Sequence, residues 1–121
     1  MLASLARAQD CVAPAKPMLR AELLFGRMIG GRLGVSEARW RDYVARELTP
    51  RFPDGLTLLD AHGQWRNANG AIVREPSKVA VIVTVNDAAA QARIAEAVAT
   101  YKQRFRQQSV GVVTTTACAA F

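Results

Sequence analysis

The segment R-F-P-D-G-L-T-L-L-D-A-H-G-Q-W-R, residues 51–66, carries most of the side chains that could do chemistry. Sites usually lie at turns and strand ends, where these side chains are placed. The planar fork of an arginine suits a carboxylate or phosphate group, and an indole beside it offers an apolar wall. We therefore predict one patch that binds a small anionic or aromatic ligand, formed by Arg51, Asp54, Trp65, Arg74 and Glu75.

Acid–base catalysis is the alternative chemistry for the same residues. Glu75 with Asp54 or Asp60 would supply two carboxylates, and one of them would have to be desolvated enough to raise its pKa. Structural roles are also open, because Arg51 could pair with Asp54 across their turn and Arg74 could stack on Trp65. The same strand ends and turns hold further polar candidates, namely Arg27, Asp60, His62 and Gln64.

Other kinds of site find little support in the residue types. His62 is the single histidine, so we predict no metal site, and we expect no cofactor because the chain lacks a phosphate-binding loop. The glycine-rich stretch I-G-G-R-L-G lacks that spacing too, and we interpret it as a flexible connector. No serine lies in a nucleophile-elbow motif.

Charge and hydropathy exclude some classes of protein. The net charge is +6 over 121 residues, but arginines are interleaved with acidic residues rather than clustered, so we expect no nucleic-acid partner. No apolar run approaches the roughly 18 to 20 residues that span a bilayer, so we predict no transmembrane segment. The length suits one domain.

Residue periodicity predicts two helices. In the first, Ser36 is a natural N-cap, and Trp40, Tyr43 and Leu48 recur at helical spacing until Pro50 ends the helix near residue 49. In the second, Asn86 or Asp87 is the cap, and one apolar stripe runs along the helix. The stripe consists of Ala90, Ile94, Ala97, Val98, Tyr101 and Phe105.

Four segments are predicted to be strands. Residues 18–27 alternate between apolar and polar, residues 79–85 are apolar on both faces, and the last strand, within residues 109–118, is rich in β-branched residues. Asn69-Gly70 predicts a two-residue hairpin turn between residues 56–66 and 71–85. That turn places Trp65 opposite Arg74 and Gly63 opposite Pro76.

The resulting order is strand, helix, strand, strand, helix, strand. It predicts an α+β, ferredoxin-like βαββαβ domain at residues 18–121, with two helices on one face of a four-stranded antiparallel sheet in the order four, one, three, two. Residues 1–17 are then a residual signal or flexible tail. Residues 79–85 leave neither face of their strand clearly polar, and a single layer of helices would expose one of the two rows. We therefore predict a homodimer through the face of the sheet that the helices do not cover.

The N-terminal residues predict export. Ala6 and Ala8 fit a small-x-small cleavage site before Gln9, although the preceding apolar region is too short for a complete signal. Exported proteins keep disulfides, and the predicted topology brings the last strand beside the first. We therefore predict a Cys11–Cys118 disulfide in a periplasmic or secreted protein.

Several motifs together resemble one known family. The segments L-L-F-G-R, V-S-E-A-R-W, R-F-P-D-G-L-T with the following G-Q-W, and R-E-P-S-K are similar to those of small bacterial exported or lipoprotein-type proteins, classified only as a domain of unknown function. The similarity extends from about Ala21 to Phe121. It implies export and an α/β domain, and it supplies no activity, cofactor or catalytic residue. This chain lacks the lipobox of the lipoprotein members.

Overall fold

The structure is a computed structural model that describes residues 10–121 of the chain. The predicted cleavage site, with Ala6 and Ala8, lies outside the described residues. The elements follow the chain as β1 (Lys16–Gly26), β2 (Met28–Ile29), β3 (Arg32–Leu33), α1 (Glu37–Tyr43), the π-helical turn η1 (Val44–Leu48), β4 (Thr57–Arg66), β5 (Ile72–Thr84), α2 (Ala88–Phe105) and β6 (Gly111–Ala119). No helix between residues 10 and 121 is long and apolar enough to cross a membrane.

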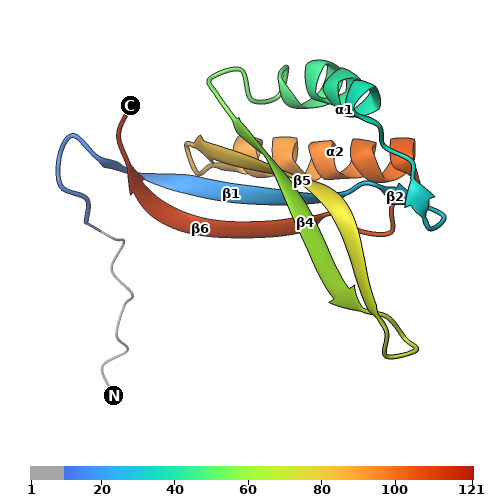
Figure 1. The fold of residues 1–121 in the computed structure, drawn as a ribbon. Coiled ribbons are helices and arrows are strands. Elements are labelled where there is room, and N and C mark those ends of the chain that lie inside the picture. The colour runs from blue at the N-terminus through green and yellow to red at the C-terminus, as the bar shows by residue number, and fades with distance from the viewer. Residues whose placement is uncertain (1–9) are drawn as a thin grey trace.

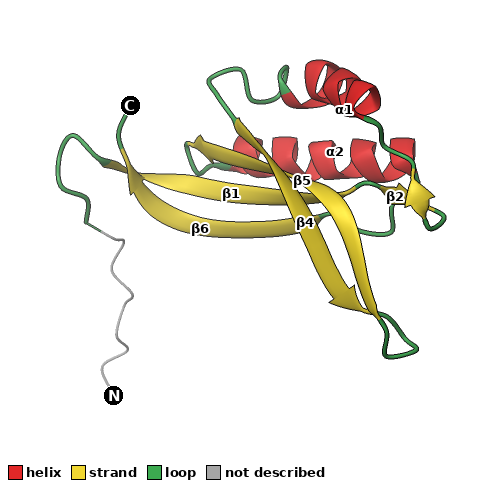
Figure 2. Cartoon of the chain, viewed as in Figure 1, coloured by secondary structure: helices red, strands yellow, loops and turns green. Residues whose placement is uncertain are grey.

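The main sheet has four antiparallel strands in the order β4-β5-β1-β6. Both helices lie on one face of this sheet, and the other face carries no helix (Figures 1 and 2). The alternation in β1 explains the layering, because its residues 19, 21, 23 and 25 are all buried, whereas Arg20 and Leu24 are exposed on the opposite face. The predicted ferredoxin-like α+β fold is confirmed. We call the uncovered side the open face.

Side-chain caps start both helices where the sequence predicts. The Oγ of Ser36 accepts a hydrogen bond from the Arg39 amide at 3.2 Å. The carboxylate of Asp87 accepts one from the Ala90 amide at 2.8 Å. The first helix continues as a π-helical turn and ends at its C-cap Thr49, just before Pro50.

Aromatic rings form the core between the helices and the sheet. Phe25 of β1 packs against Trp40 and Tyr43 of α1, with ring centroids 5.1 Å and 5.8 Å away, and against Tyr101 of α2 at 4.7 Å. The Tyr43 hydroxyl donates a 2.6 Å hydrogen bond to the Ala97 carbonyl. The Tyr101 hydroxyl likewise donates a 2.5 Å hydrogen bond to the Gly26 carbonyl. Both buried phenol hydroxyls therefore have a hydrogen-bond partner.

The β4–β5 hairpin differs by one residue from its predicted register. Trp65 pairs with Val73 and Gly63 with Glu75, so the predicted pairing of Trp65 with Arg74 is wrong. The loop spans residues 67–71 instead of two residues, because the Asn67 side chain accepts hydrogen bonds from the amides of Asn69 and Ala71. An Asx-type turn at Asn67 thus sets the register.

The glycine-rich stretch is also more ordered than predicted. Instead of a flexible connector, β2 and β3 form a small hairpin in which Met28 pairs with Leu33 and Ile29 with Arg32. Gly30 and Gly31 form its turn with φ angles of 58° and 78°, a region that glycine adopts without steric cost.

The predicted disulfide between Cys11 and Cys118 is present, with its Cα atoms 5.5 Å apart. Pairing of Pro17 with Cys118 brings the end of β6 beside the start of β1. The bridge therefore links the two ends of the described chain across neighbouring strands.

Candidate functional site

The five residues predicted to form one patch lie in two separate places. Arg51 and Asp54 lie in the turn before β4, whereas Trp65 lies near the end of that strand. The eight-residue step from Thr57 to Trp65 spans about 26 Å of extended chain. The two halves of the predicted patch line different cavities, which have no lining residue in common.

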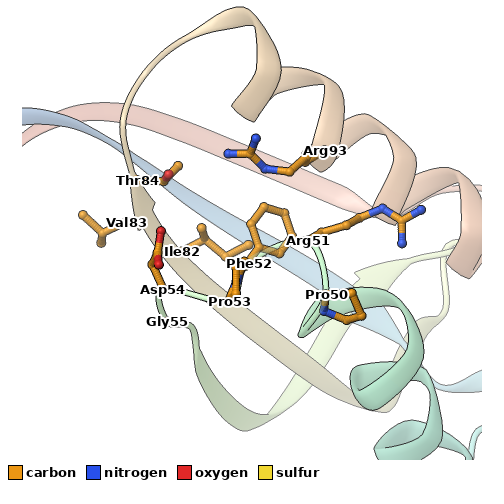
Figure 3. A pocket seen from close by; sticks show the side chains of 10 residues that line it. All are labelled: Pro50, Arg51, Phe52, Pro53, Asp54, Gly55, Ile82, Val83, Thr84 and Arg93. Carbon is orange, nitrogen blue, oxygen red and sulfur yellow. The ribbon is translucent and has the colours of Figure 1, made fainter.

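The first half contributes to a cavity of about 270 Å³, which we call the turn pocket. It lies between the turn that precedes β4, the last residues of β5 and the first turns of α2 (Figure 3). Phe52 and Ile82 form its buried apolar wall. The complete lining is Pro50, Arg51, Phe52, Pro53, Asp54, Gly55, Ile82, Val83, Thr84 and Arg93.

Arg51 borders the turn pocket, but its guanidinium forms ion pairs with two carboxylates outside the pocket lining. Its Nη1 lies 2.6 Å from Glu47, and its Nε lies 3.3 Å from Glu96. Partial burial opposes the charge, but these two carboxylates raise the pKa of Arg51 above its usual value. Its guanidinium points away from the cavity in Figure 3. The predicted alternative of an Arg51–Asp54 pair does not form.

Arg93 of α2 is the other arginine of the turn pocket. Its Nε is buried and lacks a hydrogen-bond partner, and its guanidinium makes no ion pair within residues 10–121. In Figure 3 this guanidinium points toward Thr84 across the pocket. The turn pocket thus has one uncompensated guanidinium, contributed by a residue that the sequence did not single out.

The second half of the predicted patch borders a larger concavity of about 770 Å³, which we call the hairpin groove. Its walls are the end of the β4–β5 hairpin, the β2–β3 turn and the segment that joins α2 to β6. The residues that line it are Leu24, Gly26, Met28, Ile29, Gly30, Gly31, Trp65, Val73, Arg74, Glu75, Arg106, Gln107, Gln108, Ser109 and Gly111.

The observed register decides which of these side chains can act together. Trp65, Val73 and Glu75 project from the open face, because side chains alternate along paired strands. Arg74 pairs with Gln64 and leaves the hairpin on the opposite face. Arg74 and Trp65 consequently form no cation–π pair, in contrast to the structural role that the sequence left open.

Glu75 occupies a half-buried position within the hairpin groove. Its Oε1 lies 3.0 Å from the place that a Cβ on Gly26 would take, so the carboxylate lies over the backbone of β1. Its carboxylate has no hydrogen-bond or ion-pair partner in the described part of the chain. Burial, with smaller contributions that include Glu75, raises the pKa of Tyr101, which keeps that phenol protonated as the donor to Gly26.

Two other sequence candidates belong to a charge network under α1. The Lys78 ammonium is buried and contacts both Asp60 and Glu37, and Arg27 also contacts Glu37. Burial opposes the charge of Lys78, but hydrogen bonds to Asp60 and Glu37 raise its pKa. Two cations and two carboxylates balance one another here, which makes the network a structural clamp between α1 and the sheet.

His62 is exposed on β4, where it pairs with Pro76. Within residues 10–121 no group of three or more His, Cys, Asp or Glu side chains is placed to hold a metal ion. The polar groove residues that the sequence did not single out include Arg106, a left-handed helix cap with φ of 52°, and Gln107, which donates a hydrogen bond to the Met28 carbonyl. Left-handed caps favour glycine or asparagine, so an arginine at residue 106 gave no local signal of this role.

Solved structures share this fold. A phage SAM lyase in complex with S-methyl-5'-thioadenosine is 16% identical with a TM-score of 0.67, covering 93% of this chain and 88% of that chain. CutA from Synechococcus elongatus is 12% identical with a TM-score of 0.58, covering 88% and 82%. At these identities the likeness shows the fold alone. No curated protein matches the chain in sequence. The chain does match, over residues 20–121, the family described as protein of unknown function, DUF3574, and it belongs to that family.

Proposed function

We propose that this chain is an exported, non-catalytic domain that binds a small ligand in the hairpin groove. The observation that carries this proposal is the shared orientation of Trp65 and Glu75, which project from one face into a groove of about 770 Å³. Ligand sites of small molecules have volumes of roughly 300 to 1,000 Å³ and combine apolar walls with a few polar groups.

The chemistry of the groove favours an aromatic ligand that carries a hydrogen-bond donor or a cation. The Trp65 side chain is 51% exposed, and a planar ring that stacks on it would remove apolar surface from water. The unpartnered Glu75 carboxylate only accepts hydrogen bonds when it is ionised, so it selects a donor. Arg106 lies in the same groove and would allow an additional anionic group.

Intrinsic fluorescence tests this proposal, because Trp40 is buried and Trp65 is the exposed indole of the described chain. S-methyl-5'-thioadenosine, adenosine and tryptamine serve as probes at millimolar concentration. In the parent protein we expect the probes to quench the fluorescence saturably and to raise the melting temperature. The rise in melting temperature should be retained in Trp65→Phe. It should be lost in Trp65→Ala and Glu75→Gln. A flat response to all three probes would contradict the proposal.

An acid–base enzyme is the second candidate, favoured by the half-buried Glu75, whose carboxylate has no partner in the described part of the chain. Asp54 is exposed in the turn before β4 and suits this role less well. Because a phage SAM lyase has a similar fold, SAM is the substrate to try first. Incubation with SAM followed by mass spectrometry separates the candidates: product formation that Glu75→Gln abolishes would replace the non-catalytic function with the enzymatic one.

We also propose that a second copy of the chain covers the open face. Leu59 and Val113 are exposed there, beside an Arg20–Glu22 ion pair of 2.9 Å that a two-fold related copy can match with its own charges. Leu59→Glu should give monomers in sedimentation velocity. Leu58→Glu, on the opposite face of the same strand, is the matched control and should stay dimeric. A parent protein that sediments only as a 13.1 kDa species would contradict the dimer.

A further inference from the structure

We propose that the turn pocket is a second ligand site, in which Arg93 binds a small monocarboxylate. This site is separate from the hairpin groove, because the two cavities have no lining residue in common. The proposal therefore does not depend on the function assigned to the groove.

The state of Arg93 is the first argument. A buried guanidinium nitrogen without a partner is unfavourable, and the structure offers it no acceptor among residues 10–121. The side chain is only partly exposed and projects across the pocket toward Thr84 (Figure 3). The terminal nitrogens of the same guanidinium also have no partner among residues 10–121. A ligand carboxylate in the pocket would accept hydrogen bonds from these nitrogens, and the Thr84 hydroxyl lies in the same lining as a further polar group.

The charges around the pocket favour a monoanion over a dianion. Glu47 and Glu96 already neutralise Arg51, so Arg93 is the one arginine of the lining with no paired carboxylate. Asp54 belongs to the same lining and would repel a doubly charged phosphate. A carboxylate carries a single charge and fits the two parallel donors of an arginine fork.

The size and walls of the pocket define the rest of the ligand. Its volume of about 270 Å³ lies at the lower limit of small-molecule sites, which excludes a large ring system. Phe52, Pro53 and Ile82 offer apolar contact beside the arginine. A carboxylate with a short aliphatic chain matches both features.

The Nε–H resonance of Arg93 in ¹⁵N-edited NMR spectra gives a direct test, with sodium propionate as the probe. Sodium chloride at equal ionic strength measures screening, and sodium phosphate tests the charge limit. We expect propionate to shift this resonance saturably, with a dissociation constant in the millimolar range, and chloride to leave it unchanged. A response no larger than that of chloride would overturn the site, and tighter binding of phosphate would overturn the carboxylate class.

Variants locate the binding. Arg93→Lys keeps the charge without the fork and should weaken propionate binding at least tenfold, and Arg93→Gln should abolish it. Arg41→Gln removes an exposed arginine of α1 outside the pocket and is the matched control for net charge. Trp65→Ala should also bind propionate like the parent. If Arg93→Gln does not fold, the propionate affinity of Arg93→Lys and the shift of the Arg93 Nε–H resonance in the parent protein still test the site. Equal binding by Arg93→Lys and the parent would overturn the role of the fork.

Discussion

The carboxylate of Glu75 lies directly over the backbone of Gly26, with Oε1 3.0 Å from the position of a Cβ at that residue. Glycine at residue 26 thus leaves room for the acid at the floor of the hairpin groove. Gly26 itself ends β1 and accepts the hydrogen bond from Tyr101, so one residue connects the groove to the aromatic core.

Substitution Gly26→Ala should displace the Glu75 carboxylate and weaken binding of the groove probes several-fold. Stability should change by less than about 1 kcal/mol, because a flexible side chain can move and alanine is favoured over glycine in a strand. Gly63→Ala is the matched control, since its Cβ would meet Glu75 Cγ at an ordinary 3.6 Å. Fluorescence titration measures both. Unchanged affinity in Gly26→Ala would show that the Glu75 position does not matter for binding.

Lys78→Met should reduce the acid sensitivity of the protein. The hydrogen bond from Lys78 holds the pKa of Asp60 below its usual 3.8, so this carboxylate stabilises the fold above that pH and the contribution is lost as pH falls through the lowered value. Asp42, whose pKa is lowered by Arg104 and Arg46, is unchanged in the variant. The difference between the urea midpoint at about pH 5 and that at about pH 2.5 should therefore be smaller in Lys78→Met than in the parent protein. Parallel losses in both proteins would contradict this.

Reduction of the Cys11–Cys118 disulfide should lower the free energy of unfolding by roughly 4 to 5 kcal/mol, because it releases a long loop in the unfolded chain. The two cysteines are 107 residues apart in sequence. Urea unfolding with and without a reductant measures the difference, and intact mass after alkylation checks the redox state. Equal midpoints in the two states would show that the bridge restrains little of the unfolded chain.

Tyr43→Phe should cost about 1 kcal/mol at neutral pH, because the buried hydroxyl no longer donates to Ala97. Thr100 still donates to that carbonyl at 3.0 Å, which limits the loss. Burial raises the pKa of Tyr43 from 10.0 to about 12, so its contribution is complete below pH 10 and disappears as pH rises through the higher value. Chemical denaturation at high pH should show a shallower decline in Tyr43→Phe than in the parent.

Much of the fold could be predicted because local sequence patterns define its helices and strands. Alternation in β1, the caps at Ser36 and Asp87 and the proline at residue 50 each define an element without reference to distant residues. The predicted register of the β4–β5 hairpin was wrong because it rested on a two-residue turn at Asn69-Gly70. In the structure the side chain of Asn67 forms an Asx turn, which lengthens the loop. A register error of one residue moves side chains to the other face of the sheet, and this error placed Arg74 on the same face as Trp65.

The site was harder to predict, because it depends on which charges are compensated. Arg51 has the stronger motif around it, but Glu96, far along the chain, neutralises it. Arg93 looks like any polar residue of a helix surface, and only the tertiary structure shows that its Nε is buried without a partner. Charge compensation between distant elements leaves no periodic signal in a sequence.

The length of the β4–β5 hairpin has a consequence for the dynamics of the groove. β1 pairs with β5 only as far as Ser77, so residues 72–76 are bonded to β4 alone and extend beyond the rest of the sheet (Figure 1). Segments with few tertiary contacts open without global unfolding, and their amides exchange with solvent sooner than those of a central strand. Trp65 and Glu75 therefore lie on a part of the sheet that should open more readily than its central strands. A ligand held between the end of the β4–β5 hairpin and the β2–β3 turn would slow deuterium uptake in this hairpin.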